Sequence, residues 1–256
     1  MSVRGQRRLG SMLAATIGVA VFLAAPPAYG EIGGQERAET TAKEARSASL
    51  AQWNFDTEGP GQPPTGFSAV TVGATEAGEW RVIAEPRALS EPHVLRQLKP
   101  CPAPGCLHLL LAEGTAYEYL DFSVRIKAAD GAGVGSSGIV IGASGGRDFY
   151  AVLVEFSTNV IEIVRFEAGE MTVLGRGQVK RWEHPWHLLR VQRNTIISNE
   201  FIETYFDNKI ALSVEDTTLR RGQIGFVTRG DTVFEFDNAR AIPLYSHRPV
   251  SPPAAY

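Results

Sequence analysis

The sequence predicts an all-β protein, an antiparallel β-sandwich of two sheets, and two observations lead to this prediction. Short stretches in which every second residue is apolar follow one another from about Trp53 to Leu244. Turn-forming residues separate these stretches, and no segment between them has the apolar periodicity of a helix. We expect roughly a dozen or more strands of about 5–8 residues, the usual range for antiparallel sandwiches.

The clearest predicted strand is residues 120–127, in which four apolar side chains alternate with four polar ones. The next long strand begins at Tyr150 and is expected to turn Tyr150, Val152, Val154 and Phe156 toward the core. Such alternation predicts sheets with one buried face. Further strands are expected at residues 161–166, 189–193, 201–206 and 233–236.

Three short segments predict the connections between strands. Asp207-Asn208-Lys209 suits a tight hairpin, because Asn tolerates a left-handed backbone. Gly145-Gly146 and Ala168-Gly169 are expected to be turns of the same kind. The sequence has no internal repeat, which disfavours a propeller or a solenoid.

Residues 1–30 have the three parts of a cleavable signal peptide: a basic start, a short apolar stretch and a cleavage site at Ala28-Tyr29-Gly30. The apolar stretch, residues 12–25, is shorter than the roughly 20 residues that a membrane-spanning helix needs. We therefore expect export to the periplasm or the cell exterior, with a mature chain that starts near Glu31 and does not insert into the membrane. An uncleaved anchor is the alternative.

The rest of the chain divides into three parts. Residues 31–50 are polar and lack an apolar face, so they are expected to be a linker or a disordered segment. Residues 51–245 are expected to be one sandwich domain, and residues 246–256, with three prolines, a flexible tail. The mature chain would carry 22 basic and 28 acidic residues, a net charge of −6. This balance disfavours nucleic acid as a partner.

Cys101 and Cys106 are the two cysteines of the chain, in the sequence Cys-Pro-Ala-Pro-Gly-Cys. In an oxidising compartment this spacing predicts a disulfide that closes a tight loop and contributes roughly 2 kcal/mol. A metal site would need two further ligands, and His93 and His108 are the histidines nearby in the sequence. We predict the disulfide and no metal site. No cofactor is predicted, and a structural calcium ion has no signature in this sequence.

Several short sequence motifs in the C-terminal half, taken in their order along the chain, resemble those of exported jelly-roll domains. They are Ser136-Ser137-Gly138-Ile139, Asp148-Phe149-Tyr150-Ala151-Val152, Trp186-His187-Leu188-Leu189-Arg190-Val191, Tyr205-Phe206-Asp207-Asn208-Lys209, Gly222-Gln223-Ile224-Gly225-Phe226 and Phe236-Asp237-Asn238. The order resembles the concanavalin A-like lectin/glucanase superfamily, in particular its 3-keto-disaccharide hydrolase-like or laminin-G-like branch, over about residues 50–245. The resemblance implies a two-sheet jelly roll whose curved face holds sugar in relatives.

The sequence departs from the hydrolase branch at two positions that the resemblance marks as functional. That branch carries an Arg shortly after the first of these motifs and an acidic residue just after the Tyr of the second motif. Here Ile141-Gly142-Ala143 ends the first strand, and Ala151 follows Tyr150. The loss of both polar groups argues against hydrolysis.

Two pairs of carboxylates are the candidates for acid–base chemistry. Glu235 and Asp237 lie two residues apart, on one strand face, but the third acid of a glucanase triplet is missing, and a solvated strand exit is expected instead. Glu155 and Glu162 flank the Ser157–Asn159 turn and are candidates to meet across that hairpin as acid and base. Surface charges on a hairpin are the alternative, because Glu155 shares its strand face with Ala151 and Leu153.

The candidates for ligand binding are one tryptophan and three arginines. An exposed indole suits a sugar ring, whose axial C–H groups match its apolar face. Trp182 lies among charged residues and is the predicted stacking platform, whereas Trp186 opens an apolar strand and is expected to be buried. The cations predicted to reach the curved face are Arg81, Arg125 and Arg165.

No catalytic or metal-binding motif stands out, and the glycines at residues 131–135 are not followed by a helix, as a nucleotide site would require. The favoured hypothesis is an exported domain that binds a carbohydrate or cell-surface polymer without cleaving it. The first alternative is a glycoside-processing hydrolase of the 3-keto-disaccharide kind. The second is a structural or protein-binding accessory domain.

Overall fold

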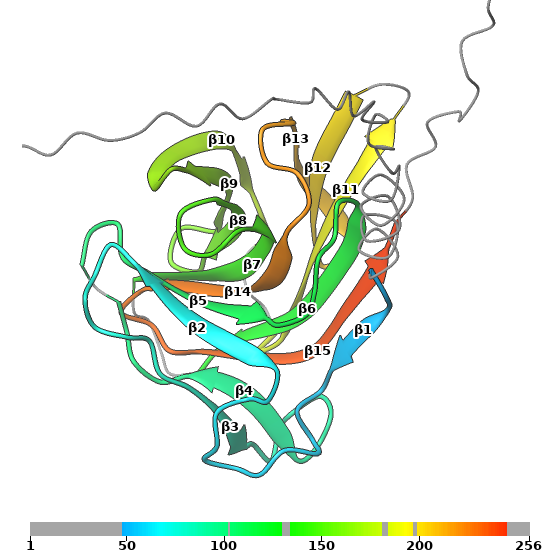
Figure 1. Ribbon diagram of the computed structural model, residues 1–256. Coiled ribbons are helices and arrows are strands. Elements are labelled where there is room, and N and C mark those ends of the chain that lie inside the picture. The colour runs from blue at the N-terminus through cyan, green and yellow to red at the C-terminus, as the bar shows by residue number, and fades with distance from the viewer. Residues whose placement is uncertain (1–47, 102, 130–133, 181–183, 197–198, 245–256) are drawn as a thin grey trace, which may run out of the picture. The chain divides into compact units, whose positions relative to one another are not determined.

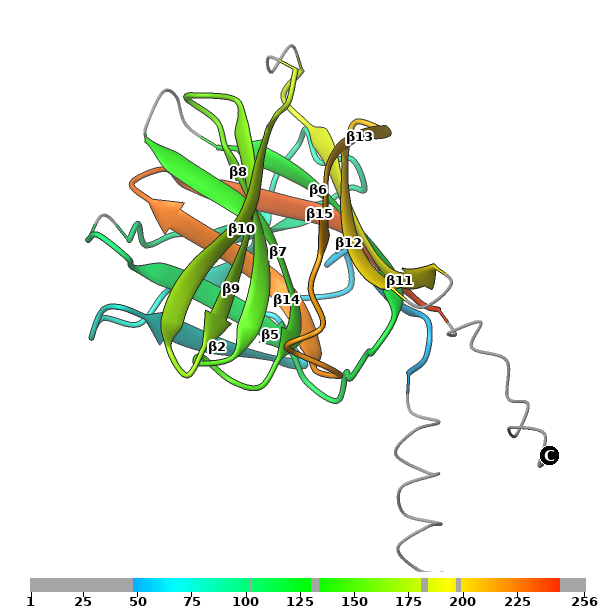
Figure 2. The ribbon, with the colours of Figure 1, turned by 90° about the horizontal axis from the view of Figure 1, so that it is seen from above.

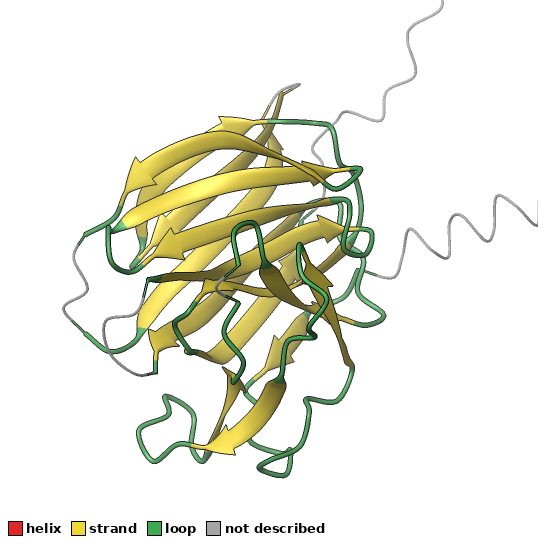
Figure 3. Ribbon diagram, turned by 90° about the vertical axis from the view of Figure 1, so that its left-hand side faces the viewer, coloured by secondary structure: helices red, strands yellow, loops and turns green. Residues whose placement is uncertain are grey.

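The computed structural model describes residues 48–101, 103–129, 134–180, 184–196 and 199–244. These residues form fifteen strands. They contain no helix (Figure 3), so the all-β prediction is confirmed. Accordingly, no helix in this part of the chain is long and apolar enough to cross a membrane. The predicted signal peptide, nearly all of the predicted linker and the C-terminal tail lie outside the described residues.

The strands build two antiparallel sheets, which we name sheet A and sheet B (Figures 1 and 2). Sheet A has the order β13 (Lys209–Glu215), β12 (Asn199–Phe206), β11 (His187–Ile196), β6 (Leu120–Ala128), β15 (Phe234–Pro243), β4 (His93–Gln97) and β3 (Trp80–Ala84), with β1 (Ala51–Trp53) paired to β15. Sheet B has the order β10 (Glu170–Gln178), β9 (Val160–Glu167), β8 (Phe149–Glu155), β7 (Gly135–Ala143), β14 (Gln223–Gly230), β5 (Leu107–Ala112) and β2 (Phe67–Val72).

The main core lies between the two sheets and is built by the predicted alternation. The four predicted apolar residues of β6 are buried there, namely Leu120, Phe122, Val124 and Ile126, and the polar residues between them face away from sheet B. From β8, Tyr150, Val152 and Val154 enter the same core. Phe156 packs beside it, with its ring 4.8 Å from that of Phe234. Both strand predictions are therefore confirmed.

A second core covers the other face of sheet B, where one buried face per sheet was expected. Its central side chains, which are at most 1% exposed, are Leu109, Val140, Leu153, Val164 and Val227. The expectation is therefore wrong for sheet B. The sheet is strongly curved (Figure 1), and all seven of its strands contribute apolar residues that pack against one another on this face. Strands buried on both faces read as continuous apolar runs, and residues 150–154 are such a run.

Two of the three predicted tight turns are present, whereas Gly145-Gly146 lies in a longer connection, residues 144–148, between β7 and β8, and only Gly145 of this pair has positive φ. Asp207 and Asn208 both have positive φ, 47° and 64°, which is the backbone of a type I′ hairpin between β12 and β13. Ala168 and Gly169, with φ of 53° and 90°, connect β9 to β10 in the same way. Since type I′ turns match the twist of the flanking strands, they hold these strand pairs in register.

Candidate ligand-binding cleft

The curved face of sheet B, where the resemblance implies a sugar site, is closed over its centre. Leu153 on β8 and Val164 on β9 are at most 1% exposed, and the rings of Phe149 and Phe166 stack beside them with centroids 4.5 Å apart. These side chains make the second core. A ligand on this face would have to displace packed apolar groups, so a sugar site has to be sought elsewhere in the fold.

Glu155 and Glu162 lie on this same face of the β8–β9 hairpin. Glu155 is opposite Val160, which makes Glu162 its diagonal neighbour, at about 7–8 Å by the usual spacing of such positions. Glu162 is buried in ion pairs with Arg229 at 2.8 Å and Arg176 at 3.2 Å. The structure thus brings both carboxylates to one face, but it engages Glu162 in structural ion pairs.

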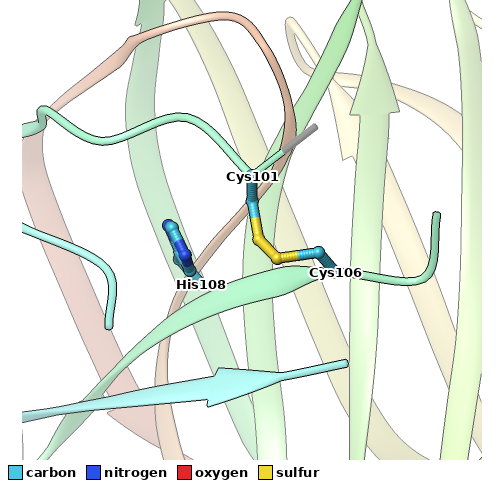
Figure 4. Close-up of side chains that lie close together, drawn as sticks. All are labelled: Cys101, Cys106 and His108. Carbon is cyan, nitrogen blue, oxygen red and sulfur yellow. A yellow bond between two sulfur atoms is a disulfide. The ribbon is translucent and has the colours of Figure 1, made fainter. Parts of the chain in front are cut away.

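The cysteine loop forms the predicted disulfide between Cys101 and Cys106 (Figure 4). The buried ring of His108 lies beside the two sulfur atoms, so the three residues are close enough to hold a metal ion. Sulfurs that are bonded to each other are not thiolates, however, and thiolates are the form that binds metal. The His108 ring is in contact with Gln97 at 3.1 Å, and burial lowers its pKa. This cluster therefore anchors the loop.

A cleft of about 510 Å³, which we name the β10–β13 cleft, opens where β10 ends, β11 begins and β12 turns into β13. Buried rings of Trp186, His187 and Phe206 contribute to its lining. The exposed side chains of Gln178 and His184 border it. A volume of this size, with apolar rings and a few polar groups, is typical of sites for small ligands.

Two glycines near the end of β10 create the cleft by letting this strand lie against β13 (Figure 1). A Cβ atom at Gly177 would lie 2.6 Å from the carbonyl oxygen of Ala211, and one at Gly175 would lie 2.8 Å from a methyl of Val214. Larger residues would push the two strands apart. The sequence Gly175-Arg176-Gly177 is the signal that locates this site, and strand periodicity alone does not reveal it.

The type I′ turn at Asp207 fixes one wall of the cleft. One carboxylate oxygen of Asp207 accepts a hydrogen bond from the backbone N–H of Leu188 at 3.0 Å. The other lies 2.7 Å from Nδ1 of His187. Nε2 of His187 is 2.7 Å from the carbonyl oxygen of His184, and the imidazole stacks on Phe206. Because both of its ring nitrogens are engaged, His187 is held as a rigid part of the wall.

Trp186 is 8% exposed, which confirms the prediction that it is buried. Its indole Nε1–H donates to the carbonyl oxygen of Arg87 at 3.1 Å, and the Lys127 ammonium lies over its ring at 5.3 Å. Arg125, from β6, also lines the cleft. The position of the indole is therefore set by the fold, and Trp186 contributes to the wall of the cleft.

The structure does not bring the three predicted arginines together. Arg81, on β3, pairs with Glu79 at 3.2 Å, and Arg165, on β9, pairs with Asp216 at 2.5 Å between the sheets. Of the three, Arg125 is the one that lines the cleft. Trp182 lies outside the described residues, so its stacking role stays a prediction.

The Asp216 carboxylate has a shifted pKa with a consequence for stability. Burial opposes its ionisation, but hydrogen bonds from the Tyr150 hydroxyl and from Thr218, together with the charge of Arg165, prevail and lower its pKa. A lowered pKa in the folded state stabilises the fold above the ordinary value of 3.8, and this stabilisation is lost as the pH falls through the folded-state value.

Asp216→Asn should therefore reduce the free energy of unfolding most at neutral pH. Its difference from the wild type should shrink as the pH falls below 3.8. Denaturant titrations of both proteins across the acid range measure this difference. If the difference in the free energy of unfolding stayed constant with pH, the lowered pKa of Asp216 in the folded state would be contradicted.

The prediction that Glu235 and Asp237 are solvated is wrong, because both are fully buried. Residues 85–92 pack against this face of β15. Glu235 forms ion pairs with Arg96 and, at 2.7 Å, with Lys127. Asp237 accepts hydrogen bonds from the backbone N–H of Ser90 at 2.9 Å and from its hydroxyl at 2.8 Å. Burial outweighs these hydrogen bonds and raises the pKa of Asp237.

No protein-family model and no curated protein sequence matches the chain significantly. Solved structures do have a similar fold. The carbohydrate-binding module CBM66 from Bacillus subtilis aligns with a TM-score of 0.54 and 15% identity, over 70% of this chain and 96% of the module. The carbohydrate recognition domain of Emp47p aligns with a TM-score of 0.52 and 9% identity, over 77% and 97% of the two chains.

A third similar structure is that of an enzyme, the GlcNAcα1-4Gal-releasing endo-β-galactosidase from Clostridium perfringens. It aligns with a TM-score of 0.51 and 12% identity, over 77% of this chain and 63% of the enzyme. At such identities a likeness defines the fold and leaves the activity open. The chain thus shares the fold of these structures, a sandwich of two antiparallel sheets, as predicted.

Proposed function

We propose that this protein is an exported, non-catalytic carbohydrate-binding domain whose ligand occupies the β10–β13 cleft. The observation that carries the proposal is the lining of the cleft, in which the rings of Trp186 and Phe206 adjoin the exposed polar side chains of Gln178 and His184. A sugar ring has apolar C–H faces and a circle of hydroxyl groups, and such a lining is complementary to both. The fold, shared with carbohydrate-binding modules, supports the same function.

The carboxylates of the cleft favour binding over hydrolysis. Most glycoside hydrolases need two carboxyl groups on either side of the scissile bond. Asp207 is the single carboxylate among the described residues that line the cleft, and His187 and Leu188 already engage it. The alternative implied by the resemblance is a glycoside-processing hydrolase of the 3-keto-disaccharide kind. It would need a pair of carboxyl groups, which the described lining residues of the cleft do not contain.

Export is supported by the disulfide between Cys101 and Cys106, since such bonds persist in oxidising compartments. The signal-peptide character of residues 1–30 points the same way. A periplasmic or extracellular location would bring the cleft into contact with cell-surface or environmental polysaccharides.

A second candidate function is a structural or protein-binding accessory domain. The apolar filling of the curved face of sheet B favours it, because that face is where a sugar-binding jelly roll of this type is expected to be open. A direct test of glycan binding separates the two candidates.

In a glycan array, the exported protein should bind a defined group of oligosaccharides. Gln178→Ala and His184→Ala should each weaken that binding about tenfold, the loss expected for roughly one polar ligand contact. The control is Met171→Ala, which removes an exposed side chain from the opposite end of β10. Trp186→Ala is unsuitable, because deleting a buried indole costs about 3–5 kcal/mol of stability.

The outcomes of this test are distinct. Binding that survives both cleft substitutions would place the ligand elsewhere on the molecule. Failure to bind any glycan would favour the accessory-domain candidate.

A further inference from the structure

The β10–β13 cleft is strongly cationic. Three of its lining residues, Arg125, Lys180 and Lys209, are positively charged and come from three different parts of the sandwich. None of the three has an ion-pair partner within the part of the chain that the structure describes. The one carboxylate lining the cleft there, that of Asp207, faces His187 and the backbone of Leu188.

Some cations elsewhere on the surface are paired with carboxylates. Lys99 pairs with Glu76 at 2.8 Å, and Arg176 pairs with Glu162 at 3.2 Å. The chain has a formal net charge of −3, so acidic side chains are in excess overall. Three cations that line one cleft without an ion pair to any described carboxylate are therefore a local feature in a chain whose net charge is negative.

Two of the cations are held close to each other. Lys180 follows the end of β10, and Lys209 is the first residue of β13, against which β10 lies. The contact with Lys180 and the repulsion between the two ammonium groups lower the pKa of Lys209, and they outweigh the opposing attraction of Asp207. Neighbouring like charges are unfavourable, and an anion placed between them would relieve this repulsion.

The glycines at positions 175 and 177 make this juxtaposition a consequence of the fold. Because β10 can approach β13 only without side chains at these positions, the two lysines are brought together by backbone packing. Both lysine side chains are exposed. The cleft has the size of a small-molecule site, which suits a short saccharide better than a nucleic-acid duplex or a membrane surface.

We infer that the saccharide bound in the β10–β13 cleft is anionic, with a carboxylate or sulfate group held between Lys180 and Lys209 and with Arg125 as a third positive charge. This inference rests on the proposed function and specifies its ligand class. The aromatic lining would contact the sugar ring, and the lysines would discriminate between charged and neutral saccharides. Because the lysine side chains are exposed, the attraction should weaken as the salt concentration rises.

The test is calorimetric titration of the full exported chain with three probes of matched size: trigalacturonate, a sulfated galactotriose and neutral galactotriose. The variant Lys180→Gln/Lys209→Gln removes both lysine charges from the cleft. The control, Lys99→Gln/Arg147→Gln, removes the same number of charges from surface positions on other loops. Thermal unfolding of each variant verifies that it is folded.

We expect one or both charged probes to bind at least tenfold more tightly than neutral galactotriose, and the probe bound more tightly identifies the anionic group. The cleft variant should lose about tenfold in affinity for the charged probe, while the control stays within about twofold of the wild type. Equal binding of charged and neutral probes, or equal losses in both variants, would overturn the inference and leave the proposed function standing. Failure of all three probes, together with an empty glycan array, would overturn both.

Discussion

Replacing Glu235 with alanine should lower the free energy of unfolding by about 3–5 kcal/mol, the usual cost of removing one partner from a buried ion pair. The Glu235 side chain is fully buried between Arg96 and Lys127, and the Lys127 side chain is 9% exposed. Without Glu235 these cations would stay in a poorly solvated site, with Glu85, 3.4 Å from Lys127, as the remaining carboxylate near them. Chemical denaturation of the variant measures the loss.

A matched control for Glu235→Ala lies on the same sheet. Glu79 pairs with Arg81 at 3.2 Å, with side chains that are 47% and 35% exposed. Solvent screens such a pair, so Glu79→Ala should cost less than about 1 kcal/mol. Similar losses for the two variants would mean that the Glu235 cluster is solvated, contrary to the structure.

Gly138→Ala should destabilise the protein by about 3 kcal/mol, at the upper end of the usual cost of overpacking. A Cβ atom at Gly138 would lie 1.7 Å from the carbonyl oxygen of Val152 on the neighbouring strand β8. Because the obstacle is backbone, β7 and β8 would have to separate in the middle of sheet B. Thermal or denaturant unfolding of the purified variant measures the effect.

The control for Gly138→Ala is a glycine in a turn. Gly145 has φ of +74°, and a Cβ atom at this position would have no other atom within 4 Å. Its replacement by alanine therefore incurs only the strain of a left-handed backbone and should cost about 1 kcal/mol. A Gly138→Ala variant no less stable than Gly145→Ala would show that the close approach of β7 and β8 is absent in solution.

Local sequence patterns predicted the fold well where a strand has one buried face. Residues 120–127 alternate cleanly and occupy β6 with the expected face inward. For residues 150–154 the alternation predicted which side chains enter the main core, but it did not predict that Ala151 and Leu153 are buried on the other face of the curved sheet B. The burial of Glu235 and Asp237 was not predicted either. The segment that covers them, residues 85–92, is remote from β15 in the sequence, so the pattern of the strand alone does not indicate it.

The candidate site was only partly predictable. Arg125 was selected from the sequence, and Trp186 was correctly expected to be buried. Lys209 and Gln178 were not selected, because they are brought together by strand register and by the approach of β10 to β13. The glycines at 175 and 177 permit that approach, but their role can be recognised only when the strand that lies opposite them is known.

We propose that the ligand binds in the β10–β13 cleft, away from the curved face of sheet B. The most direct test is an NMR titration of isotope-labelled protein with the saccharide that binds most tightly in the array. We expect the largest chemical-shift changes at the Trp186 indole N–H and at the backbone amides of His184 and Lys209. Shifts concentrated at Glu155 and Glu162 on the β8–β9 hairpin, with the cleft signals unchanged, would contradict it.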